Sequence, residues 1–95
     1  LSGDRYDAAT MADYGFVTEV AEDAEAAALE TARDLADGPP IAQGVIKDAV
    51  HAGRDDREAG FEVEAMGFGH LFGTEDLMEG ITAFASDRDP EFEGE

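Results

Sequence analysis

Hydrophobic residues recur along this chain at the spacing of amphipathic helices. Phe61, Ala65, Phe68 and Phe72 follow one another at intervals of three or four positions, so they share one face of a helix predicted over residues 55–72. Similar apolar stripes predict three other long helices, over residues 22–38, 39–53 and 74–89. The pattern therefore indicates a helical protein whose helices each have one apolar face.

The predicted helices begin and end at residues suited to those positions. Thr74 is a good N-cap for the last helix, and acidic residues occupy the first turn after it. The pair Asp89–Pro90 is expected to end that helix, because proline disfavours helical geometry in the residue before it. Gly38 and Gly53 are expected to end the two helices over residues 22–38 and 39–53.

The first twenty residues predict a different local structure. Asp7 is a suitable N-cap for a short helix with the sequence AATMADY, which Gly15 stops. The segment GFVTEV, residues 15–20, is rich in β-prone residues and is predicted to be extended. The expected fold class is therefore mainly α, with four to five helices and one short extended stretch.

Three glycines interrupt the helix predicted over residues 55–72. Gly60, Gly67 and Gly69 each weaken a helix by about 0.5–1 kcal/mol relative to alanine. A side chain of one hydrogen atom lets another backbone approach closely, so we expect these positions to pack against a neighbouring helix.

The length of the chain limits how much apolar surface it can bury. Its 95 residues suffice for one small domain, which buries a modest fraction of its surface. Several apolar faces and few residues to cover them predict a docked or oligomeric element. No apolar run of 18 residues and no signal-peptide pattern occur, so we expect neither a membrane span nor a leader.

The chain is strongly acidic, with a formal net charge of −18 and 24 acidic against six basic residues. This sign excludes binding to nucleic acid or to an anionic membrane surface as an expected function. Disorder is disfavoured because 43% of the residues are hydrophobic and periodic, and the D-x-D-x-D-G calcium loop is absent. We interpret the acidity as adaptation to a salt-rich cytoplasm, where screening reduces repulsion between carboxylates.

No catalytic or metal-binding constellation stands out in the sequence. Cysteine is absent, which excludes disulfides and thiol chemistry, and the two separated histidines make a zinc site improbable. Pairs of acids such as Glu62 and Glu79 are expected by chance among so many. The glycines of GFGHLFG, residues 67–73, lack the order of a phosphate-binding loop. We therefore predict no catalytic residue, no metal ligand and no cofactor for the chain itself.

Three motifs in order resemble the enoyl-CoA hydratase/isomerase (crotonase) family, and the match runs nearly from end to end. The start is similar to L-[ST]-G-[DE]-x-x-x-A-x-x-A-x-x-x-G-L-V, with matches at Leu1, Gly3, Asp4, Ala8, Gly15 and Val17, while Met11 replaces an alanine. The middle resembles L-A-x-G-P-P-x-A-x-x-x-x-K, with matches at Pro39, Pro40, Ala42 and Lys47. The third motif resembles F-x-T-x-D-x-x-E-G-x-x-A-F, with matches at Phe72, Thr74, Asp76, Glu79, Gly80, Ala83 and Phe84.

The resemblance implies that this is the C-terminal helical, trimerisation part of a crotonase fold. It divides the chain into residues 1–20, the end of the crotonase core, and residues 21–95, a helical assembly region. The implied partners are the protein's own upstream catalytic region, neighbouring subunits of a homotrimer or hexamer, and an acyl-CoA substrate. The family's catalytic glutamates and oxyanion-hole amides lie upstream, so the chain alone is expected to be inactive.

The resemblance also implies roles for three aromatic or basic residues. Phe84 is the expected packed residue of the assembly surface, and Phe68 matches an aromatic that reaches a neighbour's acyl-CoA pocket. The tail matches the family at Arg88, Pro90 and Phe92. Asp87 stands where the family has a lysine near CoA, and a carboxylate cannot supply that positive charge. The resemblance therefore implies that either Arg88 makes the CoA contact in place of residue 87 or the end of the chain makes none.

Three functions are compatible with these features. The first is the C-terminal part of an enoyl-CoA hydratase, which adds water to 2-enoyl-CoA to give 3-hydroxyacyl-CoA in fatty-acid breakdown. The second is a sister activity, an enoyl-CoA isomerase or a dihydroxynaphthoyl-CoA synthase. The third is a non-catalytic helical interaction module. The LFGTED stretch, residues 71–76, favours the hydratase over the synthase.

Overall fold

The computed structural model describes residues 2–95, so Leu1, the first position of the N-terminal motif, lies outside the described residues. Five α-helices and no strand form within this range, which confirms the mainly α fold class. The chain divides into two compact units that meet between Arg33 and Asp34. The domain boundary predicted between residues 20 and 21 stays a prediction.

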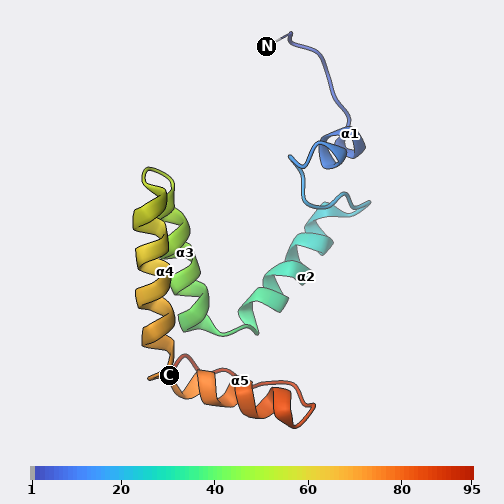
Figure 1. The fold of residues 1–95 in the computed structure, drawn as a ribbon. Coiled ribbons are helices and arrows are strands. Elements are labelled where there is room, and N and C mark those ends of the chain that lie inside the picture. Colours follow the sequence, from blue (N-terminus) through green and yellow to red (C-terminus); the bar gives the residue numbers. More distant parts are fainter. Residues whose placement is uncertain (1) are drawn as a thin grey trace. The chain divides into compact units, whose positions relative to one another are not determined.

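The first unit contains α1 (Ala8–Asp13) and most of α2 (Ala24–Ala36) (Figure 1). Asp7 caps α1 as predicted, because its carboxylate accepts a hydrogen bond of 2.8 Å from the Thr10 amide. That amide lowers the pKa of Asp7 by stabilising the charged form. Residues 15–20 are not helical, and they begin in a turn, with Gly15 at φ +77°.

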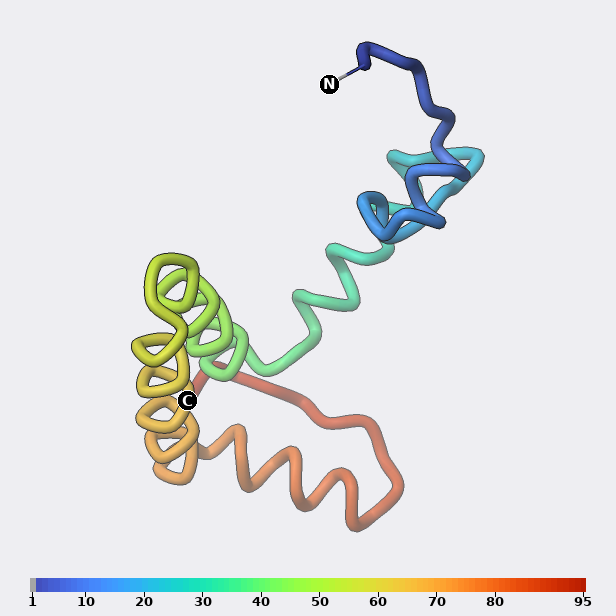
Figure 2. Tube along the Cα trace, turned by 45° about the horizontal axis from the view of Figure 1, so that its top comes forward, coloured from blue at the N-terminus to red at the C-terminus, as the bar shows by residue number. Residues whose placement is uncertain are grey.

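The second unit is built on a hairpin of α3 (Pro40–Gly53) and α4 (Arg57–Leu71), which lie side by side in Figures 1 and 2. Asp56 caps α4 by accepting hydrogen bonds from the amides of Glu58 (2.9 Å) and Ala59 (3.4 Å). Both helices lie within two residues of the ranges predicted from the apolar pattern.

Two of the three glycines predicted to permit close packing do so at the contact between α3 and α4. A Cβ atom at Gly60 would lie 2.7 Å from the Cα of Gly53, and one at Gly67 would overlap the side chain of Val45. A Cβ atom at Gly69 would meet no other atom within 4 Å. The expected close approach of another backbone is thus confirmed at Gly60, while Gly67 faces a side chain of the neighbouring helix and Gly69 has no such neighbour among the described residues.

The last helix, α5 (Glu75–Ala85), begins where predicted and ends earlier than predicted. Thr74 caps it by accepting from the Leu77 amide at 3.3 Å, while its hydroxyl donates to the Leu71 carbonyl at 2.7 Å. At the other end, Asp87 has a positive φ of 51°, and the Arg88 amide donates to the Ala83 carbonyl at 3.1 Å. This left-handed residue ends the helix before the chain reaches Pro90.

The left-handed conformation of Asp87 predicts a stabilising substitution. Asp87→Gly is expected to raise the free energy of unfolding by about 0.5–1 kcal/mol, because glycine adopts positive φ without a steric penalty. Asp89→Gly is the matched control, since it removes the same charge where φ is negative, and it should give no gain. Urea unfolding followed by circular dichroism measures both, and equal effects would contradict the assignment.

Little of the apolar surface is covered within the chain. Among residues 2–95, Ala83 is the one buried hydrophobic residue, at 1% exposure. Large side chains on the predicted helix stripes are open to solvent, such as Phe61, Phe68 and Ile81. The apolar faces that the sequence predicts are therefore formed but exposed. This agrees with the expectation of a docked or oligomeric element. None of the described helices is long and apolar enough to span a membrane.

Candidate functional site

The tail, defined here as residues 88–95, folds back along α5 and is held by a buried carboxylate. Asp76, in the first turn of α5, is only 6% exposed. Its two carboxylate oxygens accept hydrogen bonds from the amides of Glu93 and Gly94, both at 2.9 Å, and its own amide donates to the Glu95 carbonyl at 2.9 Å. Three contacts thus join the end of the chain to the start of α5.

A second carboxylate one turn further along α5 holds the beginning of the tail. Glu79 accepts two hydrogen bonds from the Arg88 guanidinium, at 2.6 and 2.9 Å, and a third from the Glu91 amide at 2.9 Å. The Arg88 hydrogen bonds, with the Glu91 amide second, lower the pKa of Glu79 from 4.5 to about 2. The Glu79 carboxylate in turn raises the pKa of Arg88. Because two hydrogen bonds join the guanidinium to the carboxylate, they fix the orientation of Arg88 relative to Glu79 as well as the distance between them.

The lowered pKa of Glu79 predicts an acid-sensitive attachment. The stabilisation it provides is complete above pH 4.5 and is lost as the pH falls toward 2, because protonation removes the charge that Arg88 pairs with. Glu79→Gln should remove this part of the pH dependence. Unfolding midpoints measured between pH 5 and pH 2 (roughly the interval between the two pKa values) compare the two proteins, and identical slopes would contradict the role of the pair.

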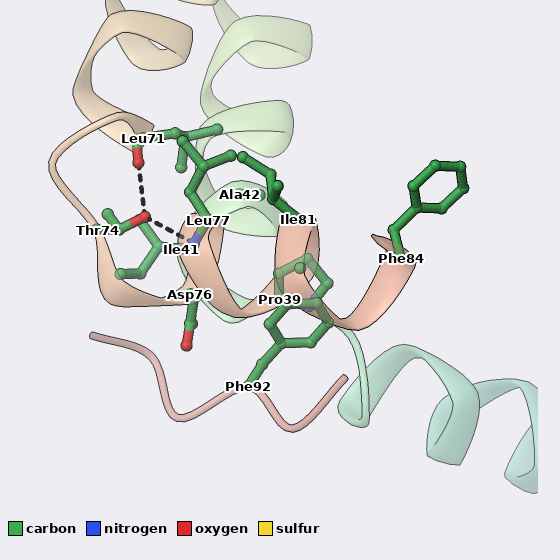
Figure 3. A pocket seen from close by; sticks show the side chains of 11 residues that line it. Pro39, Ile41, Ala42, Leu71, Thr74, Asp76, Leu77, Ile81, Phe84 and Phe92 are labelled. Carbon is green, nitrogen blue, oxygen red and sulfur yellow. Dashed lines mark hydrogen bonds between the residues drawn. The ribbon is translucent and has the colours of Figure 1, made fainter. Parts of the chain in front are cut away.

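The tail also closes one side of an apolar groove in the second unit. The groove has a volume of about 360 Å³ and is formed by the start of α3, the end of α4, one face of α5 and Phe92 of the tail (Figure 3). The Phe92 ring lies over Gly80, where a Cβ atom would come within 3.6 Å of it. Phe84 stands at the edge of the groove, and its ring points away from the other labelled side chains in Figure 3.

The two residues predicted to meet CoA lie on different elements. Phe68 is on α4, where it is 61% exposed and packs edge-on against Phe72 with ring centroids 5.2 Å apart. Arg88 lies in the tail, pairs with Glu79 and lines a hollow beside α5 to which Phe68 does not belong. Within residues 2–95 no group of three or more His, Cys, Asp or Glu side chains is placed to hold a metal ion.

Phe84, the expected packed residue of the assembly surface, is 90% exposed in the single chain, so its packing against another subunit stays a prediction. Its helix turns the ring outward at the last turn of α5, where no other segment of the second unit covers it. Phe84 can therefore become buried only against chain outside the second unit.

The role of the third sequence motif was missed because its residues act on a segment with no period of its own. From the sequence, Asp76 belongs to the first turn of the helix and Glu79 is one acid among many, and both match the third motif without a contact assigned to either. In the structure Asp76 and Glu79 hold the tail, Gly80 makes room for Phe92, and Ala83 is buried beneath the chain reversal. The sequence signal for this attachment of the tail was the spacing of these four residues along one helix.

The comparisons with known proteins agree with this geometry. The family model described as enoyl-CoA hydratase/isomerase matches residues 1–95. The chain is 34% identical over 97 residues to a probable mitochondrial enoyl-CoA hydratase 2 of Arabidopsis thaliana, covering 99% of this chain and 32% of that protein. The chain therefore belongs to the enoyl-CoA hydratase/isomerase family and spans about a third of the length of this relative.

Two solved structures share its fold. An enoyl-CoA hydratase subunit I of Geobacillus kaustophilus superposes with a TM-score of 0.83 at 34% identity, over 99% of this chain and 38% of that one. The enoyl-CoA hydratase of Bacillus anthracis superposes with a TM-score of 0.80 at 32% identity, over 93% of this chain and 35% of that one. The five helices thus correspond to a helical part of a larger crotonase fold.

Proposed function

We propose that these residues are the C-terminal, assembly-forming part of an enoyl-CoA hydratase that adds water to 2-enoyl-CoA to give 3-hydroxyacyl-CoA in fatty-acid breakdown. The observation that carries the proposal is the combination of family membership with uncovered apolar faces. A chain that buries a single hydrophobic residue among those described, while exposing Phe84 beside a groove, needs the rest of its protein and neighbouring subunits to complete its core.

The proposed role of the segment is to join subunits and to cover the CoA site. The catalytic groups then belong to the upstream region, and no cofactor is needed beyond the acyl-CoA substrate itself. The same proposal places the protein in the cytoplasm of a salt-adapted cell, supported by the net charge of −18. A homotrimer or hexamer is the expected assembly.

Phe68 and Arg88 are the proposed contacts to CoA, and the structure shapes what each can contribute. Arg88 uses three of its N–H donors on Glu79 and on the Asp89 carbonyl, which leaves two for a ligand. Its charge is compensated by Glu79, so we expect it to orient a phosphate or the adenine rather than to supply a free cation. Phe68 presents an open aromatic face for a neighbour's pocket.

The role of Phe68 predicts a change in substrate binding with a matched control on the same helix. Phe68→Ala should raise KM for an acyl-CoA substrate by about tenfold, the loss expected from an aromatic contact worth about 1–1.5 kcal/mol. Phe61→Ala removes an equal ring that is equally exposed, at 61%, and should leave KM unchanged. Steady-state kinetics of the assembled protein decide between them, and equal effects would contradict a specific role for Phe68.

The proposed reaction is tested on the complete protein. We would express the whole open reading frame and follow a short 2-enoyl-CoA in concentrated KCl by the absorbance of its conjugated thioester. Loss of this absorbance supports the hydratase. A folded protein that binds CoA without turnover would favour an isomerase or synthase of the same family, and a protein that binds no CoA would favour a non-catalytic module.

A further inference from the structure

The tail connects two parts of the second unit that otherwise touch little. Of the described helices, α3 and α4 alone pack extensively against each other. The tail leaves the end of α5, runs back to its first turn, and brings Gly94 to Pro40 at the start of α3, where a Cβ atom on Gly94 would lie 3.2 Å from the proline ring. Phe92 joins Pro39 and the α5 side chains in the apolar groove. The tail is therefore a strap between α5 and the hairpin.

The strap is fastened almost entirely through its backbone. Asp76 and Glu79 accept hydrogen bonds from the amides of Glu91, Glu93 and Gly94, and only Arg88 contributes a polar side chain. The attachment consequently depends on two carboxylates of α5, which must stay ionised and close to the tail.

The charges around this attachment oppose it. A hollow of about 640 Å³ lies between α5 and the tail. From α5, the carboxylates of Glu75, Asp76 and Glu79 line it. From the tail, Asp89, Glu91, Glu93 and Glu95 line it, and Arg88 is the one basic residue in this lining. Seven carboxylates against one guanidinium produce a net repulsion that grows as the tail approaches α5.

Ionic strength sets how strongly this repulsion acts. The hollow is open to water, so its charges are screened by salt, with a Debye length of about 10 Å at 0.1 M and about 3 Å at 1 M. Concentrated salt suppresses repulsion across the hollow more than it weakens the short bonds at 2.6–2.9 Å to the partly enclosed carboxylates. Salt therefore favours the closed strap.

We propose that residues 88–95 form a salt-dependent strap, closed on α5 at high ionic strength and released at low ionic strength. Release removes Phe92 from the apolar groove and frees α5 from the start of α3. The strap thereby couples the ionic strength of the solvent to the shape of the apolar surface beside Phe84. This inference goes beyond the proposed reaction and does not depend on it.

Hydrogen exchange of the whole protein tests the strap directly. We expect the amides of Glu91, Glu93 and Gly94 to exchange at least about tenfold faster in roughly 0.1 M KCl than in roughly 3 M KCl, since their acceptors are lost when the strap opens. Amides within α3 and α4 should change much less and serve as the internal reference. Equal protection of the tail at both salt concentrations would overturn the proposal.

Two variants separate the strap from a general effect of charge. Asp76→Asn keeps the shape of the side chain but replaces one acceptor oxygen by a donor, so it should expose the Glu93 and Gly94 amides even in concentrated KCl. Glu75→Gln removes the same charge from the same turn, at a residue that accepts no hydrogen bond from a tail amide. In this variant the tail amides should stay protected from exchange down to a lower KCl concentration. An Asp76→Asn protein with a fully protected tail would likewise overturn the proposal. The salt titration of the unaltered protein decides the matter if a variant fails to fold.

Discussion

Gly60→Ala is expected to lower the free energy of unfolding by about 1–3 kcal/mol, although alanine is the better helix former. The new methyl group would lie 2.7 Å from the Cα and 3.0 Å from the amide nitrogen of Gly53, and 3.1 Å from the Ala49 carbonyl oxygen. All three neighbours are backbone atoms, so no side-chain rotation relieves the overlap, and the two helices must move apart.

Gly69→Ala is the matched control in the same helix. A methyl group there meets nothing within 4 Å, so the substitution should raise the free energy of unfolding by about 0.5–1 kcal/mol through helix propensity alone. Urea midpoints in concentrated KCl measure both variants at constant charge. If Gly60→Ala proved as stable as Gly69→Ala, the close contact of α3 with α4 would be refuted.

Phe84→Ala is expected to weaken subunit assembly by at least about 30-fold in dissociation constant. An aromatic residue that is exposed in the single chain and buried at the centre of an interface typically contributes about 2 kcal/mol or more. Phe84 is 90% exposed and stands at the rim of the apolar groove, so it supplies a large area for a partner.

Sedimentation at a series of protein concentrations measures this loss. Phe84→Leu is the conservative control, because it keeps much of the apolar area and should shift the dissociation constant only slightly. Exchange protection of the α3–α4 hairpin should remain, which separates lost assembly from lost folding. An assembly unaffected by Phe84→Ala would exclude this face of α5 from the interface.

The helices could be predicted because the signals that define them are local. The apolar stripe through Phe61, Ala65 and Phe68 lies within one helix, and Asp7 and Thr74 accept hydrogen bonds from amides three residues later. Such contacts involve neighbours along the chain and leave a period in the sequence. The end of α5 escaped prediction, because it depends on a left-handed Asp87 rather than on Pro90.

The predicted site and the observed contacts differ for a related reason. Arg88 was assigned to CoA from its motif position alone, and the structure pairs it with a carboxylate nine residues earlier. Because Glu79 compensates the charge of Arg88, the role proposed for Arg88 is to orient CoA rather than to supply a free cation. Phe68 is exposed on α4, which is compatible with a contact to another subunit, and that contact stays a prediction.

By itself, the sequence determined that the chain is helical, where the four long helices begin, that their apolar faces exceed what the chain can cover, and that the surface is strongly acidic. Only the tertiary structure decided which glycines of α4 contact α3 and where the tail lies. The physical reason is the separation of the partners. Asp76 binds amides 17 and 18 residues away, in an extended segment that has neither a helical period nor a cap. Gly60 and Gly69 look alike along the chain, and they differ only because Gly53 of the neighbouring helix lies against the first.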